Sequence, residues 1–120
     1  MMDESSLLRV GILGAAGYTG RELVALIARH PRVQLVFATS ESEAGSPLRR
    51  LSRNAPDIPL TRAADVDLES VDVVFSCLPH GHSLHWVERA LAAGPRVIDL
   101  SADLRVPDPR AAAWTREAVY

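Results

Sequence analysis

The sequence RVGILGAAGYTG, residues 9–20, joins an apolar strand to a turn in which glycine recurs at every third position, 11, 14, 17 and 20. A helical pattern follows at once, with Leu23, Val24 and Ile27 on one face. Glycine suits such a turn because it adopts positive φ freely and lets the backbone touch a pyrophosphate. The helix then directs free N–H groups and the positive end of its dipole toward that pyrophosphate. The stretch predicts a dinucleotide site; the alternative is a tight turn that packs helix on strand and binds nothing.

Strand and helix patterns alternate along the rest of the chain. Apolar runs predict strands at residues 7–13, 33–39, 71–77 and 96–100, and helical spacing predicts helices at 17–30 and 80–93. Weaker signals predict a short strand at 58–61 and a short helical stretch that begins at Pro107. This order predicts an α/β fold with a Rossmann-type, doubly wound parallel sheet, whose ligands bind at the carboxyl ends of the strands. We expect residues 1–120 to form one NAD(P)-binding domain.

Composition excludes several classes of protein. The net charge of −2 offers no basic surface for nucleic acid or an anionic membrane, and all thirteen basic residues are arginine, so no lysine can form a Schiff base. One cysteine, Cys77, allows neither an internal disulfide nor a multi-cysteine metal site. The sequence contains neither a secretory signal nor an apolar run long enough to span a membrane. We therefore expect a cytoplasmic protein without nucleic-acid or membrane partners.

The second predicted strand ends in a polar run, TSESE at residues 39–43. In dinucleotide-binding folds this position, about 20 residues after the glycines, distinguishes NAD from NADP. The hydroxyls of Thr39, Ser40 and Ser42 favour the 2′-phosphate of NADP, whereas the two glutamates favour the free 2′-OH of NAD. One of the arginines at 49 and 50 could add positive charge. These residues leave the choice between NAD and NADP open. The alternative is that they form a solvated polar loop that binds neither cofactor.

The third predicted strand leads into SCLPHGHS, residues 76–83. Pro79 fixes the backbone and Gly81 lets it turn, so this loop could lie against a nicotinamide or its ribose. The histidines at 80, 82 and 85 suggest a metal as an alternative, but no cysteine or carboxylate in the segment completes a ligand set, and we expect no metal. Cys77 ends a buried strand without a charged partner nearby in the sequence, which favours a structural role over a nucleophile.

The fourth predicted strand continues into VIDLSADLR, residues 97–105. Ser101 and Arg105 come just after the strand end, where an arginine could hold a carboxylate or a phosphate in bidentate fashion. The alternative is that Arg105 pairs locally with one of the neighbouring aspartates.

Four stretches together resemble one family of enzymes. They are GAAGYTG at 14–20, Thr39-Ser40 with Ala44-Gly45, LPHG at 78–81 and VIDLSADLR at 97–105. In this order and spacing they are similar to the N-terminal part of the N-acetyl-γ-glutamyl-phosphate reductases, which belong to the aspartate-semialdehyde dehydrogenase superfamily. The LPHG and IDLSAD pieces are specific, whereas the glycine turn is shared by many families.

The resemblance implies an NADP-dependent reductive dephosphorylation in arginine biosynthesis. In this family a cysteine thiolate attacks a small-molecule acyl phosphate to give a thioester, and hydride from NADPH then yields the aldehyde. The implied cofactor-binding residues are Gly14, Ala15, Ala16, Gly17, Tyr18, Thr19, Gly20, Thr39, Ser40, Leu78, Pro79, His80 and Gly81. Ser101 and Arg105 are the implied substrate-binding residues, and the whole enzyme is expected to be a homo-oligomer. The alternatives are an aminoadipyl-phosphate reductase, an aspartate-semialdehyde dehydrogenase or a stand-alone nucleotide-binding module.

The sequence departs from the family pattern at several positions. Ala16 stands where Ser or Thr is usual, which removes one side-chain hydrogen bond near the phosphates but none of the backbone donors. Leu104 stands where Phe is usual, which is a packing change. The chain ends at Tyr120, before the position of the family's catalytic cysteine, and Cys77 does not match that cysteine. These 120 residues are therefore expected to bind the cofactor without catalysing the reaction.

Overall fold

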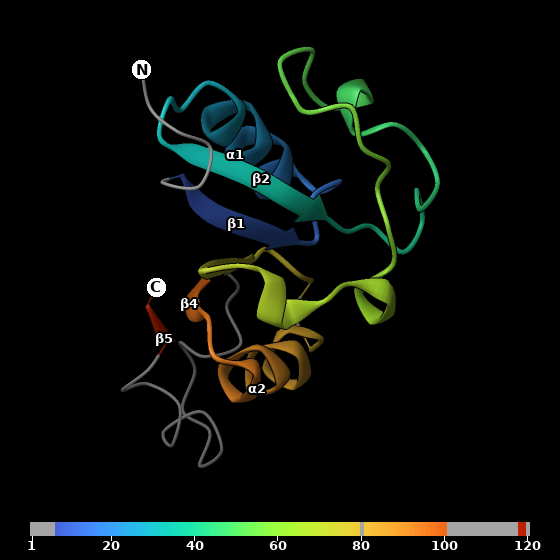
Figure 1. Cartoon of the computed structure of the whole chain (residues 1–120). Helices are drawn as coiled ribbons and strands as arrows, with labels where there is room; N and C mark the ends of the chain where they lie inside the picture. Colours follow the sequence, from blue (N-terminus) through green and yellow to red (C-terminus); the bar gives the residue numbers. More distant parts are fainter. Residues whose placement is uncertain (1–6, 80, 101–117, 120) are drawn as a thin grey trace.

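The computed structural model describes residues 7–79, 81–100 and 118–119, and these form an α/β fold around one parallel sheet (Figure 1). The sheet order is β2-β1-β3-β4-β5. The strands are β1 (Leu8–Leu13), β2 (Val33–Ala38), β3 (Val73–Ser76), β4 (Arg96–Asp99) and β5 (Ala118–Val119). The chain runs outward from β1 to β2 and then returns to the other side of β1, so the strand order reverses between β1 and β3. Ligands of doubly wound sheets bind at such a reversal, beyond the carboxyl ends of the strands.

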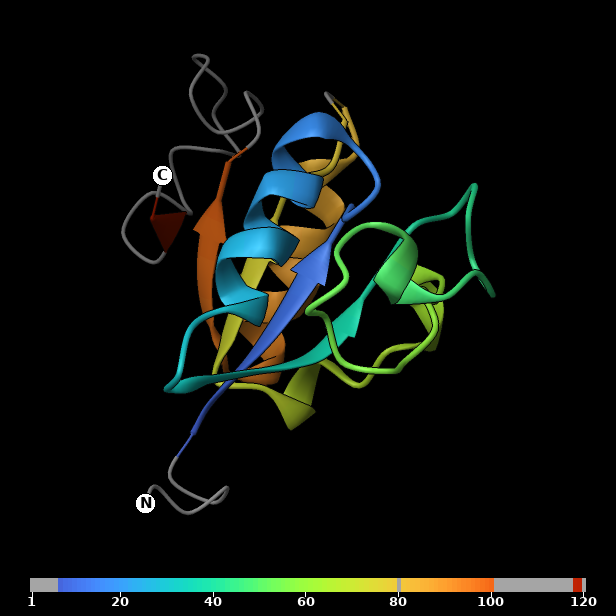
Figure 2. The ribbon, with the colours of Figure 1, turned by 90° about the horizontal axis from the view of Figure 1, so that it is seen from above.

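Helices α1 (Tyr18–Ala28) and α2 (Ser83–Ala93) cover opposite faces of the sheet (Figures 1 and 2). Val24 and Ile27 of α1 share a buried cluster with Val10 and Ile12 of β1. On the other face, α2 packs with a second cluster that contains Leu13 of β1. Residues of β1 contribute to both clusters because successive side chains of a strand point to opposite faces of the sheet. The sheet therefore divides the core into two layers.

The helix ends follow the local sequence. Helix α1 ends at Ala28, close before Pro31, which disfavours helical geometry in the residue that precedes it. Helix α2 ends at Ala93 and is capped by Gly94, whose φ of 113° is the left-handed conformation that glycine adopts at a C-terminal cap. Three short 3-10 helices, η2 (Leu48–Arg50), η3 (Ala63–Asp65) and η4 (Leu68–Ser70), lie between β2 and β3.

Two sequence predictions for the secondary structure need correction. The short strand predicted at 58–61 is absent; this segment makes only isolated bridges, Thr39 with Thr61 and Pro47 with Pro59. Proline lacks the N–H that a ladder of bonds requires, which accounts for the interruption. The helix predicted from residue 80 begins at Ser83. The helical stretch predicted after Pro107 lies outside the described residues, and β5 was not predicted.

An irregularity in the pairing of β1 with β2 explains one of the four glycines. Val10 pairs with Leu35, whereas Gly11 pairs with Phe37, so Val36 is the extra residue of a bulge. Leu35 and Phe37 consequently join different core clusters. The ring of Phe37 lies against Gly11, where a Cβ atom would overlap it. Glycine at position 11 therefore serves packing within the sheet and not ligand binding.

No helix of the described part of the chain is long and apolar enough to cross a membrane.

Candidate functional site

A cavity of about 420 Å³ lies at the carboxyl ends of β1, β2 and β3. Its walls come from the glycine turn, the loop after β2 and the loop that leads into α2. The lining residues are Gly14, Ala16, Gly17, Thr39, Ser40, Glu41, Ser42, Ala63, Cys77, Leu78, Pro79, His82 and Trp86. Its position at the reversal of strand order is where dinucleotides bind in this class of fold.

Gly14 fixes the turn between β1 and α1. Its φ is +83°, and a Cβ atom there would lie 2.8 Å from the carbonyl oxygen of Cys77. The N–H of Gly14 donates to Oγ1 of Thr39 at 3.1 Å, and the N–H of Ala15 donates to the carbonyl oxygen of Thr39 at 2.7 Å. These bonds hold the glycine turn against the end of β2. Glycine is required at position 14 by the protein itself, with or without a ligand.

Gly17 and Gly20 differ in what surrounds them. A Cβ atom on Gly20 would lie 2.7 Å from the Cα atom of Ala15, so glycine at 20 lets α1 pack tightly on the turn. A Cβ atom on Gly17 would meet no atom within 4 Å, and its φ of −75° suits any residue. Gly17 lines the cavity and caps α1 without a side-chain hydrogen bond, and the first turn of α1 holds no acidic residue. This leaves the helix N-terminus and its dipole directed at the cavity for an anion.

The loop after β2 forms the polar wall of the cavity. Thr39 and Ser40 are buried, and the N–H of Ser40 donates to the carbonyl oxygen of Thr61 at 2.9 Å. Oγ of Ser40 lies 3.4 Å from Oγ of Ser42. The carboxylate of Glu41 accepts from the N–H of Ala63 at 3.3 Å, which ties it to η3. Hydroxyls and one carboxylate therefore meet at the place expected for the adenosine ribose.

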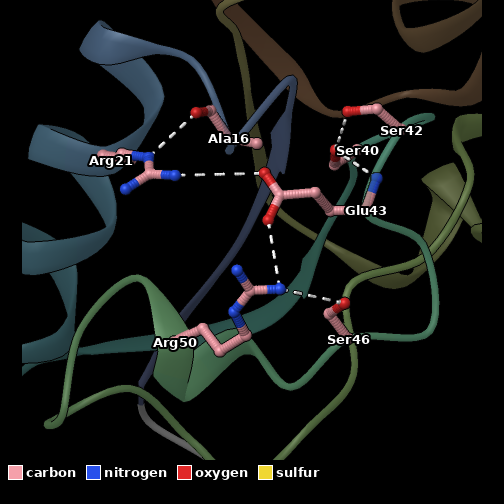
Figure 3. Close-up of polar contacts among 7 residues, drawn as sticks. All are labelled: Ala16, Arg21, Ser40, Ser42, Glu43, Ser46 and Arg50. Carbon is pink, nitrogen blue, oxygen red and sulfur yellow. Dashed lines mark hydrogen bonds and ion pairs between the residues drawn. The ribbon is translucent and has the colours of Figure 1, made fainter.

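Arg21, Glu43 and Arg50 meet beside this wall (Figure 3). Oε2 of Glu43 lies 3.9 Å from Nη2 of Arg21, and Oε1 lies 3.5 Å from Nη1 of Arg50. Arg49 points elsewhere, because its Nε donates to the carbonyl oxygen of Ala55 at 3.0 Å. Of the two arginines that the sequence offered, Arg50 is the one near the site. Arg21 was not predicted, although its position one turn after Gly17 on α1 was the available signal.

The loop after β3 forms the opposite wall. The N–H of Cys77 donates to the carbonyl oxygen of Leu13 at 2.8 Å, and the N–H of His82 donates to the carbonyl oxygen of Pro79 at 3.1 Å. Leu78 and Pro79 thus present an apolar surface to the cavity. Trp86, which was not predicted, lines the cavity one helical turn after His82. The guanidinium of Arg89 lies 4.9 Å from the centre of its ring.

Burial, and to a lesser degree the negative charge of the Asp99 carboxylate, raises the pKa of the Cys77 thiol to about 11. A thiol with this pKa is protonated at neutral pH and is a poor nucleophile. This agrees with the structural role predicted for Cys77. Among the described residues, no three His, Cys, Asp or Glu side chains gather into a metal site.

The structure brings together most, but not all, of the predicted cofactor-binding residues. Those that line the cavity are Gly14, Ala16, Gly17, Thr39, Ser40, Leu78 and Pro79. The predicted residues that do not line it are Ala15, Tyr18, Thr19, Gly20 and Gly81. Ala15 is buried beneath the turn, and the side chain of Tyr18 is exposed to solvent. His80, Ser101 and Arg105 lie outside the described residues.

Comparison with known proteins identifies the family. Residues 9–120 match the sequence model of a family described as the semialdehyde dehydrogenase NAD-binding domain. The chain belongs to this family. The resemblance inferred from the four motifs and the predicted α/β fold are both confirmed.

Curated relatives with similar sequences are N-acetyl-gamma-glutamyl-phosphate reductases. The protein from Alkaliphilus metalliredigens (strain QYMF) is 42% identical over 113 residues, which are 90% of this chain and 33% of that protein. The protein from Methanosphaera stadtmanae (strain ATCC 43021 / DSM 3091 / JCM 11832 / MCB-3) is 48% identical over 105 residues, or 86% of this chain and 30% of that protein. This semialdehyde dehydrogenase NAD-binding chain therefore spans about a third of the length of these relatives.

Solved structures with the same fold include aspartate-semialdehyde dehydrogenases. The Vibrio cholerae enzyme II, complexed with ASA, superposes with a TM-score of 0.75 at 23% identity, covering 94% of this chain and 37% of that one. The Candida albicans enzyme with NADP gives a TM-score of 0.70 at 23% identity, covering 82% of this chain and 31% of that one. At this identity the likeness establishes the fold alone.

Proposed function

We propose that this chain is the NADP-binding part of an enzyme that reduces N-acetyl-γ-glutamyl phosphate to its semialdehyde, with release of phosphate, in arginine biosynthesis. The observation that carries the proposal is the open space above Gly17, at the N-terminus of α1 and inside the cavity. The fold does not need glycine there, but a pyrophosphate that approaches the backbone does. Relatives that are 42–48% identical bear the name of this reductase.

Each wall of the cavity would bind a different part of NADP. The turn from Gly14 to Gly17 and the first amides of α1 would bind the pyrophosphate. Ser40 and its neighbours after β2 would contact the adenosine ribose and its 2′-phosphate. Leu78 and Pro79 would exclude water from the nicotinamide half. Bound NADPH supplies the hydride that reduces the acyl group.

Cys77 would take no part in the chemistry, because its thiol is protonated at neutral pH. The attacking thiolate of the proposed reaction therefore has to come from another cysteine, outside these residues. Ser101 and Arg105 remain the proposed residues for the substrate phosphate, as the resemblance implies. We also propose, on the same basis, that the whole enzyme is a cytoplasmic homo-oligomer.

The substrate can be tested on the enzyme encoded by the reading frame that contains these residues. NADPH oxidation would be followed with N-acetyl-γ-glutamyl phosphate, with an aminoadipyl phosphate and with aspartyl phosphate. We expect the highest kcat/KM with the first substrate. The other two are included because the motifs are similar to paralogues and because solved structures of the same fold include aspartate-semialdehyde dehydrogenases. A higher kcat/KM with either of them would contradict the proposed substrate, and no oxidation with any would favour a binding module without catalysis.

A further inference from the structure

We propose that Arg21 and Arg50 receive the 2′-phosphate of NADP, and that Glu43, which lies between them, limits the preference for NADP over NAD. The inference rests on the proposed function, because it names the residues of the same cofactor site that read the 2′-phosphate.

The three side chains come from separate segments of the chain and converge next to Ala16 and Ser40, two residues of the cavity wall (Figure 3). Arg21 belongs to α1, Glu43 to the loop after β2 and Arg50 to η2. Nε of Arg21 donates to the carbonyl oxygen of Ala16 at 3.0 Å, and Ala16 lines the cavity. The guanidinium of Arg21 therefore lies between Ala16 and Glu43. A second contact, 3.4 Å between Nη1 of Arg50 and Oγ of Ser46, holds Arg50 on the other side.

The cluster is joined to the cavity wall through Ser40. The N–H of Glu43 donates to Oγ of Ser40 at 3.1 Å, and Ser40 and Ser42 both line the cavity. The end of the second strand is where the adenosine ribose lies in dinucleotide-binding folds. A phosphate on the 2′-oxygen of that ribose would extend past Ser40 and Ser42 to the arginines.

Both arginines are accessible to such a phosphate. Their side chains are 52% and 60% exposed, whereas that of Glu43 is 24% exposed. The ion-pair distances of 3.9 and 3.5 Å are longer than a hydrogen bond, and exposed ion pairs of this kind are weak. A phosphate carries more negative charge than one carboxylate and matches the fork of an arginine in bidentate fashion. The phosphate would therefore displace Glu43 as the partner of both guanidinium groups.

Glu43 has two opposing effects on that phosphate. It keeps the two arginines close together, but its own negative charge repels the incoming anion. The first effect is partly redundant, because Ala16 and Ser46 also hold the arginines. Removal of the charge while the shape is kept should therefore strengthen NADP binding. The carboxylate of Glu43 faces the two arginines and does not line the cavity, so it would not reach the 2′-OH of NAD as the sequence suggested, and the affinity for NAD should not change.

The experiment is a calorimetric titration, with NADPH and with NADH, of the enzyme encoded by the reading frame that contains these residues. We expect Arg21→Gln and Arg50→Gln each to raise the Kd for NADPH about tenfold and to leave the Kd for NADH unchanged. Glu43→Gln should lower the Kd for NADPH about threefold to tenfold, again without effect on NADH. Arg32→Gln is the matched control, because Arg32 is exposed just before β2, at the opposite end of that strand. Circular dichroism would verify that each variant is folded.

The outcomes separate this inference from the proposed function. If the arginine variants alter both Kd values equally, or alter neither, the inference is wrong while the dinucleotide site stands. If Glu43→Gln weakens NADPH binding, Glu43 organises the arginines and does not oppose the phosphate, which also overturns the inference. If the folded parent protein binds neither dinucleotide, both the proposed function and this inference are wrong.

Discussion

Gly17 and Gly20 lie three residues apart, yet the structure requires glycine at them for different reasons. Gly20 has to lack a side chain because α1 packs on the Cα atom of Ala15. Gly17 has open space and an ordinary backbone conformation, so the folded chain alone gives no reason for glycine there. The spacing of glycines in the sequence could not distinguish these two roles, because it contains no information on which Cα atoms face the helix and which face the cavity.

The contrast leads to a prediction about two substitutions. Gly17→Val should lower the thermal unfolding temperature only slightly, since valine is a poorer N-cap than glycine. It should abolish saturable NADPH binding, because the branched side chain would occupy the place of the pyrophosphate. Gly20→Ala should lower the free energy of unfolding by about 1–3 kcal/mol, because the added methyl group overlaps the backbone of the turn. Calorimetric titration and thermal unfolding measure the two properties separately. A Gly17→Val variant that is folded and binds NADPH with the affinity of the parent would contradict the account.

Helix α2 is attached to the sheet by a buried polar network. Oγ of Ser83, the first residue of α2, donates to Oδ1 of Asp99 in β4 at 2.9 Å and lies 2.9 Å from Oγ of Ser76 in β3. All three residues are completely buried. Because the single hydroxyl hydrogen of Ser83 goes to Asp99, Ser76 donates to Ser83. The network joins two strands and a helix at the end of the sheet where the cavity lies, and it thereby positions the helix that carries Trp86.

Removal of the Ser83 hydroxyl should lower the free energy of unfolding more than removal of the Ser76 hydroxyl. Ser83→Ala takes a donor from a buried carboxylate and should reduce the free energy of unfolding by about 1–3 kcal/mol. Ser76→Ala leaves the bond to Asp99 intact and should cost about 0.5–1.5 kcal/mol, the usual net value of one hydrogen bond. Urea denaturation of the two variants and the parent provides the comparison. Equal losses, or a larger loss for Ser76→Ala, would show that the network is not centred on Ser83.

The whole molecule shows which features a sequence can predict and which it cannot. The unit β1-α1-β2 was predictable, because apolar runs, helical spacing and Pro31 are local signals. The bulge at Val36 was not, because it depends on the partner strand and on the ring of Phe37. The strand predicted at 58–61 was wrong, because strand propensity alone does not supply a neighbour with a continuous ladder.

The candidate site was likewise predictable from the sequence only in part. Residues of the glycine turn and of the Leu78–Pro79 segment were found because each adjoins the end of a predicted strand. Trp86 was missed because it lies inside a helix, where an aromatic residue more often belongs to the core. The cluster of Arg21, Glu43 and Arg50 was not predictable as a unit, because only the folded arrangement of three separate segments brings it together. The order of the strands in the sheet brings these residues together, because it places the ends of β1, β2 and β3 around one cavity.

The most direct test of the account is an NMR titration of the isotope-labelled chain with NADPH, read at the backbone amides and the Trp86 indole. We predict saturable shifts at Gly14, Ala16 and Gly17 and at the indole, because all of them line the cavity. The amide of Arg32, at the opposite end of β2, should not shift and serves as the internal control. Shifts confined to residues away from the cavity, or no saturable shift in a folded sample, would contradict the central claim that this turn and its helix bind the dinucleotide.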